Sequence, residues 1–242
     1  MPDRTDDQTL LFVTQVAPYS PKAPYHTAFG LAGAHGVLPQ AWLAFRQIAD
    51  VVGLRASLVE DVRELEPGGV GAARAVVLFT IGETPWAADQ RAELLDGVRR
   101  GATALVVVHS GLDACLEWDD YGRLAGARFD GHPWTREFEA DVVDRDHPAT
   151  AHLGATWTCT DEIYTFRDLR PDAHVLLRIP AERLDLATKA VVEPPFGFPL
   201  SWCALEGDGR TFTTALGHFP ACWESNDYLA HVAGGLAWAM DT

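Results

Sequence analysis

The chain has 242 residues, of which 48% are hydrophobic, and its formal net charge is −15. This length fits one large domain or two small ones with a sizeable apolar core. The strongly negative field repels phosphate backbones and anionic lipid headgroups, so we expect neither nucleic acid nor a membrane as a partner.

The N-terminal part predicts a tail, a strand and a long loop. Residues 1–8 are polar and acidic and lack the apolar core of a signal peptide, so we expect a flexible tail and a cytoplasmic protein. Residues 9–16 are typical of a strand. The loop over 17–36 is rich in Pro, Tyr and His and is long for a compact domain, which often marks a functional loop.

A helix, a short strand and an apolar run follow at 39–53, 55–60 and 75–81. Thr84-Pro85 then predicts the start of a second helix, with Thr84 as its N-cap and Gly101 as its end. The next apolar run, TALVVV, breaks off at His109. Runs that are apolar throughout favour a parallel sheet covered on both faces.

The second half predicts shorter strands with few helices between them, at 137–143, 161–167, 174–179, 198–204 and 211–217. A last helix is expected over 226–239. The simplest account is a single α/β domain over residues 9–242 with β-rich additions. The four cysteines form no C-x-x-C pair, so we expect reduced, mostly buried thiols.

The strongest candidate site is the end of the predicted strand at His109-Ser110-Gly111. Ligands of open α/β sheets bind beyond the carboxyl ends of the strands, and Gly111 permits a tight turn there. The position resembles a nucleophile elbow, although no G-x-S-x-G is present. Ser110 is a nucleophile only if a base accompanies it, and a turn residue is the simpler interpretation. A buried His109 satisfied by the backbone is the alternative.

Further candidates lie at other predicted strand ends and turns. His132 and Trp134 share a predicted turn, and His218 ends a strand in the same style as His109. The adjacent carboxylates of Asp161 and Glu162 would point to opposite faces of a strand, so only one could enter a given site. Each of these residues also has a purely structural interpretation.

Tryptophans offer platforms for the apolar face of a sugar, although most tryptophans are core residues. Trp202, within FPLSWC, is the candidate platform on the strand predicted over 198–204. Tyr164, two residues beyond Glu162 on the same predicted strand, is a further candidate for contact with a substrate.

The ordered series VVVHSG, YGRLAGARFDGHP, DRDHPAT, DEIYTF, PLSW, GRTFTTALGH and GGLAWAM resembles the trehalose-utilisation, or ThuA-like, family from about residue 75 to the C-terminus. The first 70 residues match poorly. The resemblance implies a class I glutamine amidotransferase-like, flavodoxin-like fold: a mostly parallel sheet with helices on both faces. The positions that match the family are His109, His132, Glu162, Trp202 and His218.

The amidotransferase comparison also excludes an activity. In those enzymes the elbow carries a catalytic cysteine within G-x-C-x-G, whereas here His109 stands at that position and Val107 replaces the first glycine. Cys115 lies too far along the chain to take over. Glutamine amidotransfer through a thiolate is therefore not expected.

The resemblance implies a small-molecule carbohydrate ligand, and we expect an enzyme, a lyase or hydrolase, that acts on trehalose-like or 3-keto disaccharides. His109 and His218 would be acid/base or metal-binding groups, with Glu162 as a base or orienting carboxylate. A divalent metal, zinc or manganese, is compatible with this inventory. Hydrolysis by two carboxylates ranks lower, because nothing pairs Glu162 with Asp113 or Glu117.

Two alternatives stay open: a non-catalytic sugar-binding or regulatory protein on a degenerate amidotransferase fold, and a metal-dependent hydrolase of another small molecule. A homo-oligomer is compatible with either. The substrate-binding set expected for an enzyme is Ser110, His132, Trp134, Tyr164 and Trp202.

Overall fold

The computed structural model describes residues 9–18 and 36–241. The predicted tail and most of the 17–36 loop lie outside the described residues. The elements of the first half are β1 (Thr9–Val13), α1 (Leu38–Val51), β2 (Arg55–Val59), β3 (Ala75–Leu78), α2 (Ala88–Arg99) and β4 (Ala104–Val108). Those of the second half are α3 (Asp119–Ala125), β5 (Arg128–Val142), β6 (Thr156–Arg167), β7 (His174–Ile179), α4 (Leu186–Lys189), β8 (Phe198–Glu206), β9 (Gly209–Thr214), α5 (Pro220–Glu224) and α6 (Asn226–Ala239).

The described strands form one nine-stranded mixed sheet with the order β2-β1-β3-β4-β9-β8-β7-β5-β6. The neighbours from β2 to β9 pair in parallel, and the pairs from β9 to β6 are antiparallel. The expected mostly parallel, flavodoxin-like sheet is therefore not confirmed. The physical reason is connection length: residues 207–208 alone join β8 to β9, which allows a hairpin but not a parallel crossover.

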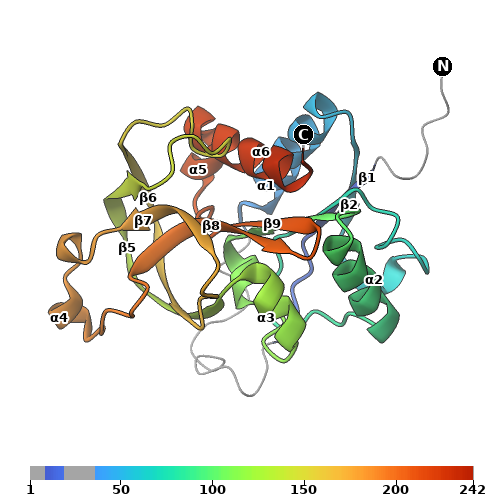
Figure 1. The fold of residues 1–242 in the computed structure, drawn as a ribbon, viewed down its shortest axis with the longest axis horizontal. Helices are drawn as coiled ribbons and strands as arrows, with labels where there is room; N and C mark the ends of the chain where they lie inside the picture. Colours follow the sequence, from blue (N-terminus) through green and yellow to red (C-terminus); the bar gives the residue numbers. More distant parts are fainter. Residues whose placement is uncertain (1–8, 19–35, 242) are drawn as a thin grey trace.

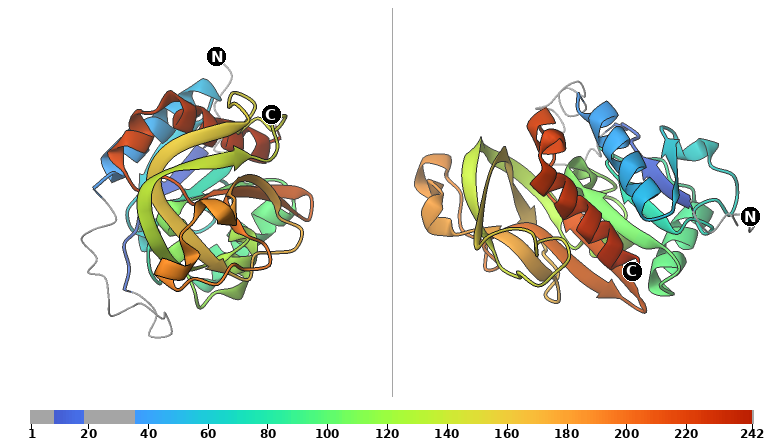
Figure 2. Two further views of the ribbon diagram at one scale, coloured as in Figure 1. Left: turned by 90° about the vertical axis from the view of Figure 1, so that its left-hand side faces the viewer. Right: turned by 90° about the horizontal axis from the view of Figure 1, so that it is seen from above.

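Helices cover both faces of the parallel half. α1, α5 and α6 lie on one side of the sheet, and α2 and α3 lie on the other (Figure 1). The side chains of β1 alternate between the two faces of the sheet. Leu10 and Phe12 pack in one apolar cluster, and Leu11 and Val13 pack in the other. The antiparallel end is different, because β5 and β6 continue as long, curved strands (Figure 2).

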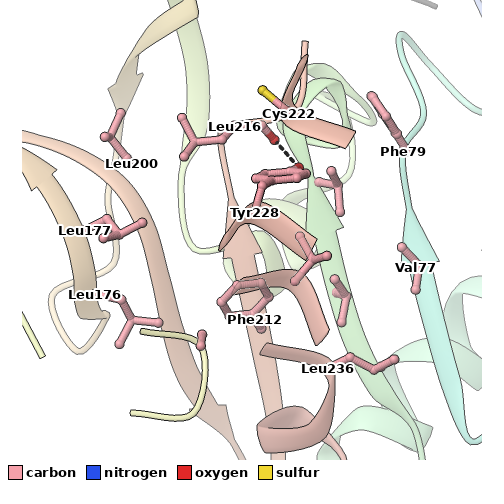
Figure 3. Packing of buried hydrophobic residues seen from close by; sticks show 14 of the residues in the cluster. Val77, Phe79, Leu176, Leu177, Leu200, Phe212, Leu216, Cys222, Tyr228 and Leu236 are labelled. Atoms are coloured by element: carbon pink, nitrogen blue, oxygen red, sulfur yellow. Dashed lines mark hydrogen bonds between the residues drawn. The ribbon is translucent and has the colours of Figure 1, made fainter. Parts of the chain in front are cut away.

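The packing of α6 fixes the segment that follows β9. The Tyr228 hydroxyl donates to the carbonyl of Leu216 at 2.9 Å, and both side chains lie in the apolar cluster around Phe212 (Figure 3). Gly217 has a φ of 126°, and a Cβ there would lie 2.5 Å from Tyr228 Oη. Only glycine fits this position, which sets the course of the chain toward His218.

Most predicted elements are present, and three of their starts were wrong. The strand β6 begins at Thr156 and not at residue 161. The helix α2 begins at Ala88 rather than at Thr84, because residues 83–87 have no helical structure and Gln90 accepts from the Ala87 amide. The strand β5 begins at Arg128 and not at residue 137. Its register shifts on either side of Gly131 accommodate Pro133, which cannot donate to a ladder. The short helix α3 was not predicted.

None of the described helices has the length and apolarity needed to cross a membrane.

Candidate functional site

The chain turns sharply at His109. Strand β4 ends at Val108, and His109 opens a single 3₁₀ turn with a φ of 47°, a left-handed conformation that non-glycine residues seldom adopt. Gly111 allows this turn to pack against the neighbouring strand, since a Cβ there would lie 2.5 Å from the carbonyl oxygen of Leu78. The elbow-like turn is present, with the unusual backbone conformation at His109 itself.

Hydrogen bonds fix the tautomer of the His109 ring. The ring is 1% exposed, and its Nδ1 lies 2.8 Å from the carbonyl oxygen of Ala215. Because a carbonyl only accepts, Nδ1 carries the proton, and Nε2 of the neutral ring presents a lone pair. The Tyr164 hydroxyl, at 2.9 Å, donates to that lone pair.

Three histidines surround the carboxyl group of Glu162, and we call His109, His132, Glu162 and His218 the His–Glu cluster. His218 Nδ1 lies 3.2 Å from His109 Nε2. Glu162 Oε2 lies 3.3 Å from His218 Nδ1 and 3.6 Å from His109 Nε2. The other carboxyl oxygen of Glu162, Oε1, lies 3.4 Å from His132 Nδ1. The residues come from the turn after β4, from β5, from β6 and from the segment after β9.

Burial controls the protonation of this cluster. Burial raises the pKa of Glu162 to about 7, and the nearby charges of Asp161 and Asp113 add to the rise. Burial lowers the pKa of His132 and of His218, and for His218 the positive charge of His132 acts in the same direction. Without a bound cation, the cluster therefore favours neutral groups over charged ones near neutral pH.

Asp161 positions the cluster without facing it. Its carboxylate is fully buried and accepts from the amides of Glu162, Gly217 and His218 at 2.8, 2.7 and 3.2 Å. The Cys222 thiol donates to it at 3.2 Å. Burial still raises the pKa of Asp161 to about 6, although these hydrogen bonds oppose the shift. The sequence analysis did not predict this positioning role for Asp161. The available signal was the pair of adjacent acids on one strand, of which only one can enter a given site.

The two tryptophans do not join the cluster. Trp134 is 3% exposed, donates to Asp185 and packs its ring edge-on against Phe198. Trp202 is 1% exposed, and its Nε1 donates to the carbonyl of Ala125 at 2.9 Å. An indole whose faces are buried cannot stack on a sugar, which argues against Trp202 as the expected platform and against Trp134 as a substrate-binding residue.

Ser110 is also buried, and its Oγ has no hydrogen-bond partner in the described part of the chain. A serine nucleophile needs a base within hydrogen-bond reach. The described residues supply none, which favours the interpretation of Ser110 as a turn residue.

A cavity adjoins the cluster at His132. Its volume is about 580 Å³, within the range of small-molecule sites. Phe129, Phe166 and Val191 form apolar walls, and Asp130 and Thr165 are among the polar lining groups. His132 belongs both to this wall and to the cluster, so it links the space to Glu162.

Three atoms of the cluster are arranged as a metal could use them. One donor atom each from His109, Glu162 and His218 lies within 4.8 Å of the others. Imidazole nitrogen and carboxylate oxygen suit several first-row divalent cations.

A family model and several solved structures are similar to this chain. The family model for ThuA, described as trehalose utilisation, matches residues 28–239. A ThuA-like protein from Bacteroides uniformis has a similar structure, with a TM-score of 0.73 and 16% identity over 98% of this chain and 93% of that one. A second from Parabacteroides merdae has a TM-score of 0.69 and 17% identity, and covers 96% and 89%.

A β-galactosidase from Bacillus circulans also contains a similar fold. It has a TM-score of 0.56 and 11% identity, and the match covers 100% of this chain but 32% of the β-galactosidase. A comparison with curated proteins gave no match. At these identities the solved structures show the fold alone.

Proposed function

The chain belongs to the ThuA family of trehalose utilisation, and we propose that it is an enzyme that acts on trehalose-like or 3-keto disaccharides. The family supports a role in carbohydrate metabolism. The observation that carries the proposal is the His–Glu cluster itself, four ionisable side chains drawn together next to a cavity that would hold a sugar.

The chemistry that fits these groups is proton transfer at a 3-keto sugar. A carbon next to a ketone releases a proton to a base, a carbon–carbon double bond forms, and the glycosidic carbon–oxygen bond breaks. The departing oxygen then takes a proton from an acid. Glu162 is the base that we propose, and His132, which lines the cavity, is the group that we propose returns the proton.

Hydrolysis by a pair of carboxylates has less support. Asp113 and Asp161 are the acids whose charges reach Glu162. Both oxygens of Asp161 are engaged by backbone amides, so Asp161 cannot also attack a sugar or activate water.

The runner-up is a non-catalytic sugar-binding protein. It is favoured by the elbow-like turn, which carries a histidine in place of a nucleophile and is followed by Ser110 without a base among the described residues. The two functions differ in what remains after Glu162 is neutralised. A binding protein keeps its ligand, whereas an enzyme loses turnover.

The test follows trehalose, sucrose and their 3-keto derivatives by NMR with the wild type, Glu162→Gln and His109→Ala. His174→Ala is the matched control, since His174 also contacts a carboxylate, at 2.7 Å from Asp144, but outside the cluster. We expect turnover by the wild type and the control, and none by the two cluster variants. Ligand-induced shifts without turnover in any sample would favour the binding protein.

A further inference from the structure

We propose that His109 Nε2, His218 Nδ1 and Glu162 Oε2 bind one divalent first-row transition-metal cation, for which Zn²⁺ is the probe. This inference deepens the proposed function by adding a cofactor to the same cluster. It can be tested without any sugar.

The distances between the three atoms match a coordination sphere. A cation that holds nitrogen and oxygen at about 2.1 Å in a tetrahedron separates its ligand atoms by about 3.4 Å. The observed separations are 3.2 Å between the two nitrogens, and 3.3 and 3.6 Å from them to the carboxylate oxygen. A cation at the centre needs little movement of any of the three side chains.

The three ligand residues also have contacts outside the coordination sphere that orient them, as ligands of metal sites usually do. The His109 Nδ1–H donates to the Ala215 carbonyl, so the Nε2 lone pair faces inward. His132 lies at Oε1 of Glu162 and leaves Oε2 for the cation. Asp161 binds the amides of both Glu162 and His218, which fixes the backbone of two ligands with one carboxylate.

The charge around the three atoms favours a cation. Glu162 is largely buried, and the carboxyls of Asp113 and Asp161 lie close enough to act on it. Several buried carboxyls together are costly unless positive charge compensates them. A divalent ion would supply that charge where neutral imidazoles do not.

Three protein ligands leave at least one position open, the pattern of catalytic rather than structural sites. A cation there could polarise a ketone or a hydroxyl of a bound sugar. The cavity has room for the rest of the substrate, and His132, which lines it, lies 3.4 Å from the Glu162 carboxyl.

The experiment measures metal directly. The full chain is stripped with a chelator, reloaded with Zn²⁺ and desalted, and zinc per chain is counted by mass spectrometry; a chromophoric chelator gives the affinity. We expect one zinc per wild-type chain and a loss of at least about 100-fold in affinity for His109→Ala, Glu162→Gln and His218→Ala, since even outer-contact changes cost 10- to 100-fold. His174→Ala should bind like the wild type, because its contact with Asp144 lies outside the cluster.

Circular dichroism and a melting curve of each zinc-free variant separate lost ligands from lost fold. Glu162→Gln is nearly isosteric and carries the test if an alanine variant does not fold. A wild type that retains no zinc, or a folded Glu162→Gln that binds as the wild type does, would overturn the proposal. Zinc bound without sugar turnover would refute only the proposed function, whereas sugar turnover by a wild type that retains no zinc would refute only the metal site.

Discussion

At the scale of single residues, a buried carboxylate outside the cluster holds the backbone that carries two of its side chains. Asp161 uses both oxygens to accept from backbone amides on either side of the site. In Asp161→Asn one oxygen becomes an amide that faces the N–H of Gly217 or His218, so donor meets donor and the segment that carries His218 must shift. We expect zinc affinity to fall about 10- to 100-fold.

The readout for Asp161→Asn is zinc affinity together with the melting temperature of the stripped protein. Cys222→Ala is the matched control, because it removes one thiol donor to Asp161 and leaves the three amide contacts in place. Equal zinc affinity in Asp161→Asn and the wild type would show that Asp161 does not position the ligands.

Tyr164 competes with a cation for one lone pair. Its hydroxyl donates to His109 Nε2 at 2.9 Å, and the same lone pair cannot hold a metal at the same time. Tyr164→Phe removes a hydrogen bond with a net value of about 1 kcal/mol. We therefore expect zinc affinity to rise about fivefold in a chelator competition. A fall in affinity would instead mean that the phenol oxygen is itself a ligand.

Histidines were easier to predict from sequence than tryptophans. His109 and His218 follow strands, and the carboxyl ends of neighbouring parallel strands meet at one edge, as those of β4 and β9 do. The face of the sheet on which Trp134 lies depends on the register of β5. The register shifts around Gly131 and Pro133 interrupt the regular alternation of side chains between the two faces. Composition alone cannot show such a shift.

At the scale of elements, the bend between β9 and α5 decides where His218 lies. Gly217 has a left-handed backbone, and a Cβ would approach Tyr228 Oη to 2.5 Å. Gly217→Ala should lower the free energy of unfolding by about 2–4 kcal/mol, from backbone strain and overpacking together. Urea denaturation measures the change, and Gly154→Ala is the control, since a Cβ there meets atoms no closer than 3.5 Å.

A double variant separates the two causes. Tyr228→Phe removes the hydroxyl that the added Cβ would meet, together with its bond to the Leu216 carbonyl. In Gly217→Ala/Tyr228→Phe the combined loss should be smaller than the sum of the single losses. Strict additivity would show that backbone strain alone accounts for the effect.

Elements with an uninterrupted pattern were predicted best. The limits of α6 and β7 were confirmed at both ends. In α6 the buried Tyr228, Val232, Leu236 and Ala239 recur at helical spacing along the whole helix. The start of α2 was wrong because Thr84-Pro85 has the composition of an N-cap but lies in an extended segment four residues earlier. Composition shows which residues could cap a helix, but it does not show at which of these positions the helix begins.

At the scale of the whole molecule, the order of strands could not be read from the sequence. The chain places β9, late in sequence, beside β4, so that a hairpin extends the parallel half into the antiparallel half. Pairing of distant strands depends on tertiary packing, which local patterns do not encode. Of the positions that match the family, the structure brings His109, His132, Glu162 and His218 together. The mixed sheet around them was not predicted.

The buried titratable groups oppose one another when the pH falls. His231 and His147 are buried, and burial lowers the pKa of each to about 4. For each histidine, the unfolded chain takes up a proton near the ordinary pKa of 6.5, before the folded chain does, so acid below that value costs stability. Asp161 and Glu162 have raised pKa values of about 6 and 7, so the folded chain takes up their protons first and gains stability over a similar range. The wild type should therefore show only a shallow dependence of stability on pH between about 7 and 4.

Replacing His231 removes its contribution to the pH dependence of the free energy of unfolding, so that this contribution can be measured by difference. In His231→Asn the amide can still donate to the carbonyl of Ala149, as His231 Nδ1 does at 2.8 Å, but nothing there titrates. Relative to the zinc-free wild type, the free energy of unfolding of the variant should rise by about 3 kcal/mol as the pH falls from 7 to 4, since each unit of pKa shift is worth about 1.4 kcal/mol. Urea denaturation at several pH values measures the difference, which should stay constant above pH 7.5. A difference that is constant over the whole range would mean that His231 titrates in the folded protein as it does in the unfolded chain, and that the acid response lies elsewhere.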